Sequence, residues 1–201
     1  MTKGNELQSR IIEMIFGKEN EDFEPPVLTE EELRELAVHE SGHCVTILAL
    51  NVDCIKLICV TIIPTKDHLG SNCYQYSEEI EQDERYYKEM ISLNIAGKIA
   101  SEQMGFNPRF YEKDLLEAYE LANAYVKKYC PSGSSEEDTN RIQKVIAEQK
   151  EIVVNVIKKN EKQLNDIANA LLKRKVLLGI EAKALFNGTM TVEQLEPIEL
   201  N

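Results

Sequence analysis

The sequence predicts a mainly α-helical protein that carries one small β-hairpin. Several long stretches place apolar residues at helical spacing, whereas the run at 55–64 (IKLICVTIIP) is rich in β-branched residues, which favour strands. The 201 residues are 43% hydrophobic and 29% charged, which is ordinary for a soluble globular protein. This length is enough for one domain with a sizeable core.

The N-terminal segment, residues 1–29, is predicted to lead into that domain. Residues 5–16 have the pattern of a short amphipathic helix, and the acidic, proline-containing stretch 17–26 is typical of a linker. The segment lacks the apolar core of a signal peptide, and the five cysteines form no C-x-x-C pair. We therefore expect reduced thiols and a cytoplasmic location.

Net charge and hydropathy argue against two classes of partner. A net charge of −12 disfavours binding to nucleic acid or to an anionic membrane surface, because both require a positive potential. The apolar stretch 44–63 contains Asn51, Asp53 and Lys56 at its centre. Each charge there would cost about 2.5–3.5 kcal/mol on membrane insertion, so we expect no membrane span.

The first helix of the domain is predicted to begin near Glu30 and to end at about Leu50. Thr29 and Glu32 have the spacing of a capping box, and two prolines precede them. Apolar residues surround the middle of this stretch on nearly every side, as in a helix buried within a domain. Polar groups in such a helix are costly unless something satisfies them.

Within this helix, His39, Glu40 and His43 form the pattern H-E-x-x-H. Two histidines four residues apart lie on one helix face, so both imidazoles can bind the same metal ion. Glu40 is rotated by about 100° from His39, which places its carboxylate beside the metal as a general base. A zinc-activated water attacking a carbonyl is the chemistry that this arrangement favours. The alternative is a helix on which the three residues coincide by chance.

A β-hairpin is predicted after this helix. Residues 55–64 form its first strand, 65–69 the turn and 70–76 the second strand. The first strand either offers an exposed edge, to which an extended substrate adds as a further strand, or is a core strand buried on both faces. The residues of the candidate edge are Val60, Thr61, Ile62 and Ile63.

Four further helices are predicted from the apolar periodicity, and a short acidic tail from Thr191 follows them. The first of these helices ends at Gly105, and the second is followed by a loop at 130–135. Their expected ranges are 84–104, 111–129, 136–160 and 161–172.

The residues alone leave the third metal ligand open. The three-histidine pattern would need glycine and histidine where Thr46 and Ala49 stand, so that class is excluded. His68, the only other histidine, lies in a polar turn and is a weak candidate. Carboxylates are the remaining source. Composition does not choose between Asp114, Glu102 and Glu117.

Four segments, in order along the chain, carry a resemblance to a known family. HESGH at 39–43 is similar to its H-E-A-G-H, and VTIIPTKDHLG at 60–70 to its V-T-I-I-P strand with a following turn and L-G. IAGKIASE at 95–102 is similar to its G-G-R-A-A-E-E helix, and KDLLEA at 113–118 to its N-D-L-x-x-A segment. With the helical region 136–186, the chain resembles the peptidase domain of FtsH-type ATP-dependent zinc metalloproteases. Ser41, Ala96 and Ser101 depart from the family pattern.

The resemblance implies a zincin-like peptidase domain with an H-E-x-x-H active-site helix over residues 30–187. Residues 1–29 then form an N-terminal segment and linker, and 188–201 an acidic tail. The implied activity is that of a zinc metalloendopeptidase that hydrolyses peptide bonds of unfolded or extended polypeptides through a zinc-activated water.

The resemblance also assigns roles to residues. His39, His43 and Asp114 would bind one Zn²⁺ per chain, because the family's third ligand is the aspartate of its N-D-L-x-x-A segment. Glu40 would activate the water and later protonate the leaving amine. Glu102 would belong to the second shell or to a surface ion pair.

Partners are also implied by the family. It places this domain after a membrane anchor and an ATPase module, but the chain has no G-x-x-x-x-G-K-[ST] pattern. We therefore expect a possible ATPase partner in trans, and a homo-oligomer, since the family assembles as rings of six. One alternative is a non-catalytic zinc-binding regulatory or partner module of an ATP-dependent protease, against which the intact Glu40 argues. Another is a metal-independent helical interaction protein.

Overall fold

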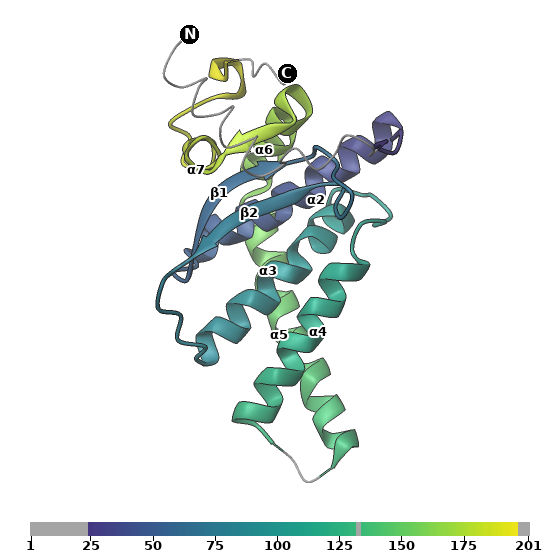
Figure 1. Cartoon of the computed structure of the whole chain (residues 1–201), viewed down its shortest axis with the longest axis vertical. Coiled ribbons are helices and arrows are strands. Elements are labelled where there is room, and N and C mark those ends of the chain that lie inside the picture. Colours follow the sequence, from purple (N-terminus) through teal and green to yellow (C-terminus); the bar gives the residue numbers. More distant parts are fainter. Residues whose placement is uncertain (1–23, 132–133, 197–201) are drawn as a thin grey trace.

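Helices dominate the structure, which is a computed structural model describing residues 24–131 and 134–196 (Figure 1). Within these ranges it confirms a mainly helical fold with a small antiparallel sheet. The elements are, in order, α2 (Glu30–Leu50), β1 (Ile55–Thr61), β2 (Ser71–Tyr76), α3 (Glu84–Gln103), α4 (Glu112–Tyr129), α5 (Ser135–Lys159), α6 (Glu161–Arg174), β3 (Val176–Leu178), α7 (Gly179–Phe186) and the 3₁₀ helix η1 (Val192–Gln194).

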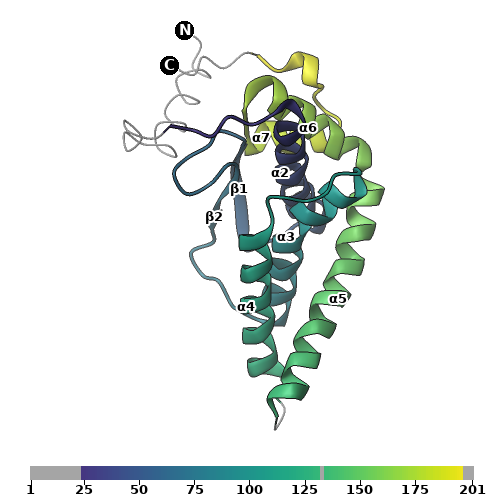
Figure 2. The same cartoon turned by 90° about the vertical axis from the view of Figure 1, so that its right-hand side faces the viewer.

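Helix α2 lies at the centre of the fold, between the sheet on one side and α6 on the other (Figure 2). Its start is the predicted capping box: the Thr29 hydroxyl accepts from the backbone N–H of Glu32 at 3.2 Å, and the Glu32 carboxylate accepts from that of Thr29 at 2.9 Å. Asn51 ends it in the left-handed conformation. Every residue from Glu35 to Ile47 is buried, which confirms the expectation that the middle of this helix lies within the domain.

The sheet has the order β2-β1-β3, and both pairs of strands are antiparallel. The predicted hairpin is therefore present, but β1 is its central strand. Thr61 is paired with Ser71 on one side and Val176 on the other, and the backbone N–H of Ile62 donates to the carbonyl of Lys175. The interpretation of Val60 to Ile63 as an open edge is wrong, because β3 occupies that side of the strand.

The remaining helices follow the predicted pattern with small shifts at their ends. Helix α3 ends just before Gly105, whose φ of 84° favours glycine. Helix α5 begins at Ser135, where the sequence predicted a loop, because the Ser134 side chain caps it by accepting from the N–H of Glu137. Helices α4 and α5 run side by side and meet at the end of the molecule farthest from the sheet (Figures 1 and 2).

Two elements beyond Arg174, β3 and η1, were not predicted, and α7 lies within the helical region 136–186 but was not predicted as a separate helix. They close the core on the side of the sheet, where Leu177, Ala182 and Leu185 are buried. In the region predicted as an acidic tail, Leu195 is 4% exposed and packs in the same core. The domain boundaries stay predictions.

Two expectations concern the ends of the chain and the membrane. The predicted helix over 5–16 lies outside the described residues. Within 24–131 and 134–196, no helix combines the length and the apolar character that crossing a membrane requires.

Candidate metal centre

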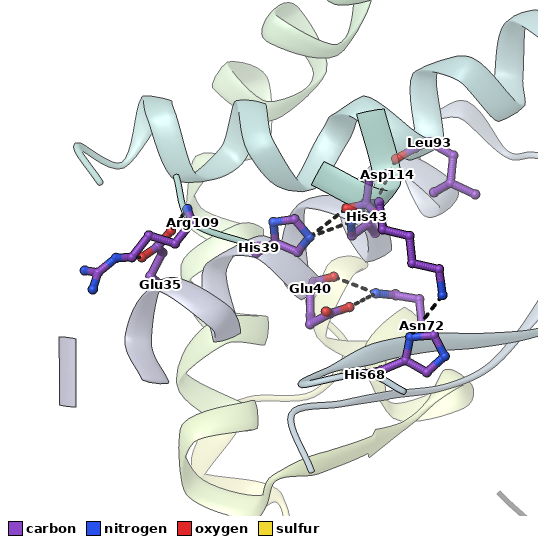
Figure 3. Close-up of polar contacts among 10 residues, drawn as sticks. Glu35, His39, Glu40, His43, His68, Asn72, Leu93, Arg109 and Asp114 are labelled. Atoms are coloured by element: carbon purple, nitrogen blue, oxygen red, sulfur yellow. Dashed lines mark hydrogen bonds and ion pairs between the residues drawn. The ribbon is translucent and has the colours of Figure 1, made fainter. Parts of the chain in front are cut away.

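Helix α2 places the two motif histidines and their neighbouring glutamate in the interior of the protein. His39, Glu40 and His43 are only 4%, 6% and 8% exposed. The two imidazoles face one another one turn apart, with their Nε2 atoms 3.0 Å from each other (Figure 3). Two ring nitrogens turned toward the same point are the arrangement that the spacing predicts for shared metal ligands.

Asp114 completes the cluster from the first turn of α4. Its Oδ2 atom lies 3.0 Å from Nε2 of His39 and 3.3 Å from Nε2 of His43. Among the described residues, these three form the only group of potential ligands whose donor atoms all lie within 4.8 Å of one another. The structure thus brings together the three residues that the family resemblance implied, and it separates Asp114 from the carboxylates that composition could not exclude.

The donor set fits a divalent metal such as zinc, which binds imidazole nitrogen and carboxylate oxygen readily. His43 contacts the carbonyl of Leu93 through Nδ1 at 2.8 Å. A neutral His43 that donates there leaves the lone pair of Nε2 free toward Asp114 and His39. This outer hydrogen bond is the kind that fixes the tautomer of a metal-binding histidine.

Helix α3 passes unusually close to the two imidazoles at Gly97. A Cβ atom at this position would lie 2.5 Å from Cε1 of His39 and 2.5 Å from Nε2 of His43. Real Cβ atoms essentially never approach so closely, so any larger residue would displace the rings. Gly97 therefore makes room for the cluster rather than for a turn of the backbone.

Glu40 lies beside the cluster and is held by β2. Asn72 donates from Nδ2 to the Glu40 carboxylate at 2.8 Å and to the Glu40 backbone carbonyl at 3.0 Å (Figure 3). Burial raises the pKa of Glu40 to about 7, with opposing effects from His43 and Asn72. A carboxyl group whose pKa lies near neutrality can both accept and return a proton.

The cluster itself is a set of coupled charges. Burial lowers the pKa of His39. Burial also opposes protonation of His43, but the hydrogen bond and the charge of Asp114 outweigh it and raise the pKa of His43 to about 9. Burial acts to raise the pKa of Asp114, yet its hydrogen bonds with both histidines bring that pKa well below the ordinary value. A proton held among these groups compensates the aspartate charge when no metal does.

An ion pair between a buried glutamate and an exposed arginine connects α2 to the segment that leads into α4. Glu35, one turn before His39 and 1% exposed, accepts from the backbone N–H of Arg109 at 2.7 Å and pairs with its Nε at 2.9 Å (Figure 3). Arg109 precedes Asp114 by five residues, so this contact helps to set where α4 begins. Nothing in the sequence paired the two residues, although a glutamate inside an apolar helix is a signal of a buried partner.

The ligand atoms open into a cavity of about 210 Å³. Tyr74 and Asn72 of β2 line it on one side, and Asn94 and Glu117 line it on the side of the helices. At its mouth, Nζ of Lys113 lies 3.4 Å from Nδ1 of His68, and both side chains are exposed. His68 lines the cavity but lies outside the ligand cluster.

Two predicted site positions lie elsewhere. Glu102 is exposed, pairs with Lys98 at 3.7 Å and does not line the cavity, so its interpretation as a surface ion pair holds and the second-shell role does not. Val60, Thr61 and Ile62 are buried in the central strand and do not line the cavity. The strand that meets the site is β2, and Asn72 is a residue that the sequence analysis missed.

Comparison of the sequence with models of known protein families and with curated protein sequences gave no match in either case.

Proposed function

We propose that the protein is a zinc metalloendopeptidase of the FtsH type, with His39, His43 and Asp114 as ligands of one zinc ion. The observation that carries the proposal is the position of Glu40. Its carboxylate is buried next to the three ligands, is not one of them, and is fixed by Asn72. A site that only stores a metal has no use for a buried acid of this kind.

The metal and the side chains of the protein contribute different parts of the proposed reaction. When bound, zinc supplies a Lewis acid that polarises a carbonyl and lowers the pKa of a water. Glu40 accepts a proton from the attacking water and returns it to the leaving amine nitrogen, a cycle that suits a pKa near 7. The Asn72 side chain orients the carboxylate, and the backbone carbonyl of Leu93 holds the ring of His43 through its other nitrogen.

The proposed substrate is an extended or unfolded polypeptide. Among the described residues, β2 is paired on one side only, with β1, and it lines the cavity through Asn72 and Tyr74. An open strand edge binds an extended chain by adding it as a further strand, with main-chain hydrogen bonds that do not depend on sequence. We thus propose β2, in place of β1, as the open edge strand that binds the substrate.

The larger assembly is part of the same proposal. By the resemblance to the FtsH-type family, we propose that the chain forms a homo-oligomer, with a ring of six as the family's arrangement. An ATPase acting in trans would deliver unfolded substrate to it. Both points rest on the motif resemblance alone.

The test is cleavage of fluorescently labelled, unfolded casein by zinc-loaded wild type and by Glu40→Gln. We expect wild type to cut and the variant to lose activity by at least about a hundredfold, as when a general base is removed. Glutamine can still accept from Asn72, so we expect both proteins to hold zinc equally. If both bind zinc and neither cuts, the chain is instead a zinc-binding partner module, or needs the ATPase that was left out.

A further inference from the structure

We infer that Cys59 and Cys73 form a dithiol site that reacts with small-molecule disulfides and closes to a disulfide between β1 and β2. The two residues are direct partners in the register of these antiparallel strands. No other two cysteines are paired in the described sheet. The inference is independent of the metallopeptidase proposal, because it concerns the chemistry of the thiols themselves.

The geometry of the strand pair permits this bond. Directly opposed residues of antiparallel strands have Cα atoms about 4.5–5.5 Å apart and side chains on the same face. A disulfide needs a Cα separation of roughly 4.4–6.8 Å. The two thiols also lie close enough for each to shift the pKa of the other. Forming the Cys59–Cys73 disulfide thus requires rotation of the two side chains, because the strands are already paired.

The two thiols have different environments, which gives them different roles. Cys73 is half-buried, and its Sγ lies 3.9 Å from the hydroxyl of Ser71, whereas Cys59 is 0% exposed. The interaction with Cys59 lowers the pKa of Cys73 to about 7, and the same interaction raises the pKa of Cys59. Cys73 is therefore the thiol that attacks, and Cys59 the one that resolves.

The reaction is a two-step exchange with a low-molecular-weight disulfide, R–S–S–R. The Cys73 thiolate attacks one sulfur, forming a mixed disulfide and releasing the first RS⁻. The Cys59 thiol then loses its proton and attacks Sγ of Cys73, forming the Cys59–Cys73 bond and releasing the second RS⁻. The two protein thiols lose two electrons and two protons, and the small disulfide is reduced to two RSH.

The remaining cysteines lack this combination. Cys44 is buried inside α2, and burial raises its pKa, so it is a poor nucleophile. Cys54 and Cys130 are partly exposed, but neither lies opposite another cysteine in the described sheet. These three provide internal controls for selectivity.

The site lies on the other face of β2 from the metal centre. Asn72 points toward Glu40, and successive side chains of a strand alternate, so Cys73 points away from it. We therefore expect the disulfide to form with or without bound zinc and to leave zinc binding unchanged. Its structural effect is to fix the pairing of β1 with the strand that holds Asn72.

The experiment equilibrates the 201-residue protein in glutathione buffers with a rising ratio of oxidised to reduced glutathione. Free thiols are then blocked, and the linked peptides are mapped by mass spectrometry. We expect the number of free thiols per chain to fall from five to three, with Cys59 linked to Cys73. Cys73→Ser should slow the loss of thiols by at least about tenfold, whereas Cys59→Ser should trap glutathione on Cys73. Cys130→Ser is the matched control and should leave the linkage unchanged.

Three outcomes would overturn the inference. These are five free thiols under conditions that oxidise an unfolded sample of the same chain, a linkage between other cysteines, and wild type that stops at the glutathione adduct on Cys73. Near-ultraviolet and far-ultraviolet circular dichroism of each variant shows that it is folded, so that an unreactive variant is not mistaken for an unfolded one.

Discussion

Helices α2 and α5 are of similar length, 21 and 25 residues, but they are built on opposite principles. In α5 the buried residues are spaced three or four apart, from Ile142 to Ile157, and the remaining residues are exposed or only partly buried. In α2 all thirteen residues from Glu35 to Ile47 are buried, including four that can carry charge. Helix α5 is amphipathic, whereas α2 is an interior helix in which buried polar side chains lie among apolar core residues.

Because of this difference, the two helices contribute to different properties of the protein. Buried charged groups cost free energy unless they are paired, whereas the apolar face of α5 stabilises the fold directly. The four buried residues of α2 that can carry charge each have a partner on another element: Glu35 on the segment before α4, Glu40 on β2, and the histidines on α3 and α4. We therefore expect changes around α2 to affect metal binding, and changes in α5 to affect stability alone.

The largest expected effect follows from removing a ligand of α2. His43→Ala should weaken zinc binding at least about a hundredfold, since even outer partners of metal ligands are worth 10–100-fold. Competition with a chromogenic zinc chelator measures the affinity. His68→Ala is the matched control, because His68 lies at the mouth of the same cavity but outside the ligand cluster. An equal loss in both variants would contradict the assignment.

Gly97→Ala tests whether α3 must leave room for the rings. Alanine normally favours a helix by about 1 kcal/mol over glycine, yet here its Cβ would lie 2.5 Å from both imidazoles. We expect a folded helical protein whose zinc affinity is at least about tenfold weaker. Ser101→Ala, one turn further along α3, removes an atom and should leave the affinity unchanged. Normal zinc binding by Gly97→Ala would show that the rings are placed differently.

Glu40→Gln should stabilise the metal-free protein at alkaline pH. The folded pKa of Glu40 is raised from 4.5 to about 7, so the folded state binds more protons than the unfolded state between these values. Its contribution to stability is present below pH 4.5 and is lost as the pH rises through 7, by at most about 3 kcal/mol. Urea unfolding at pH 5 and pH 8 should show a smaller pH-dependent loss in the variant. Glu102→Gln, at an exposed ion pair, should behave as wild type.

The smallest effect is expected in α5. Ile157→Val removes one methylene from a residue that is 1% exposed, and should lower the free energy of unfolding by about 0.5–1.5 kcal/mol. Zinc affinity should stay within twofold of wild type. Ile152→Val on the exposed side of the same helix should change stability by less than about 0.5 kcal/mol. A marked loss of zinc affinity in Ile157→Val would mean that the packing of α5 and the geometry of the metal centre depend on each other.

Local signals made most of the fold predictable. The capping box at Thr29 and Glu32, the glycine at 105 and the apolar spacing of α5 each act within a few residues, and the observed helix ends lie close to the expected ones. Strand β3 has only three residues, too few for an alternating pattern, so its pairing with β1 could not be read from the sequence. That omission produced the wrong edge at Val60 to Ile63.

The residues of the candidate site also fall into those that a local pattern predicts and those that depend on long-range packing. The spacing of His39 and His43 on one helix predicts a shared ligand pair from sequence alone. Asp114 is 71 residues beyond His43 along the chain, so its place in the cluster depends on how α4 packs against α3, and only the family resemblance suggested it. Asn72 and Arg109 likewise act through long-range contacts, for which a single sequence holds no local pattern.

The central claim is that one zinc ion, bound by α2 and Asp114, makes the protein a peptidase. Its most direct test is a zinc titration of chelator-treated wild-type protein in which bound metal and cleavage of unfolded casein are followed together. We predict that activity is absent without metal, rises in proportion to bound zinc and reaches its plateau at one equivalent per chain. Cleavage that survives complete removal of the metal, or a fully zinc-loaded chain that never cuts even with an ATPase partner present, would contradict the claim.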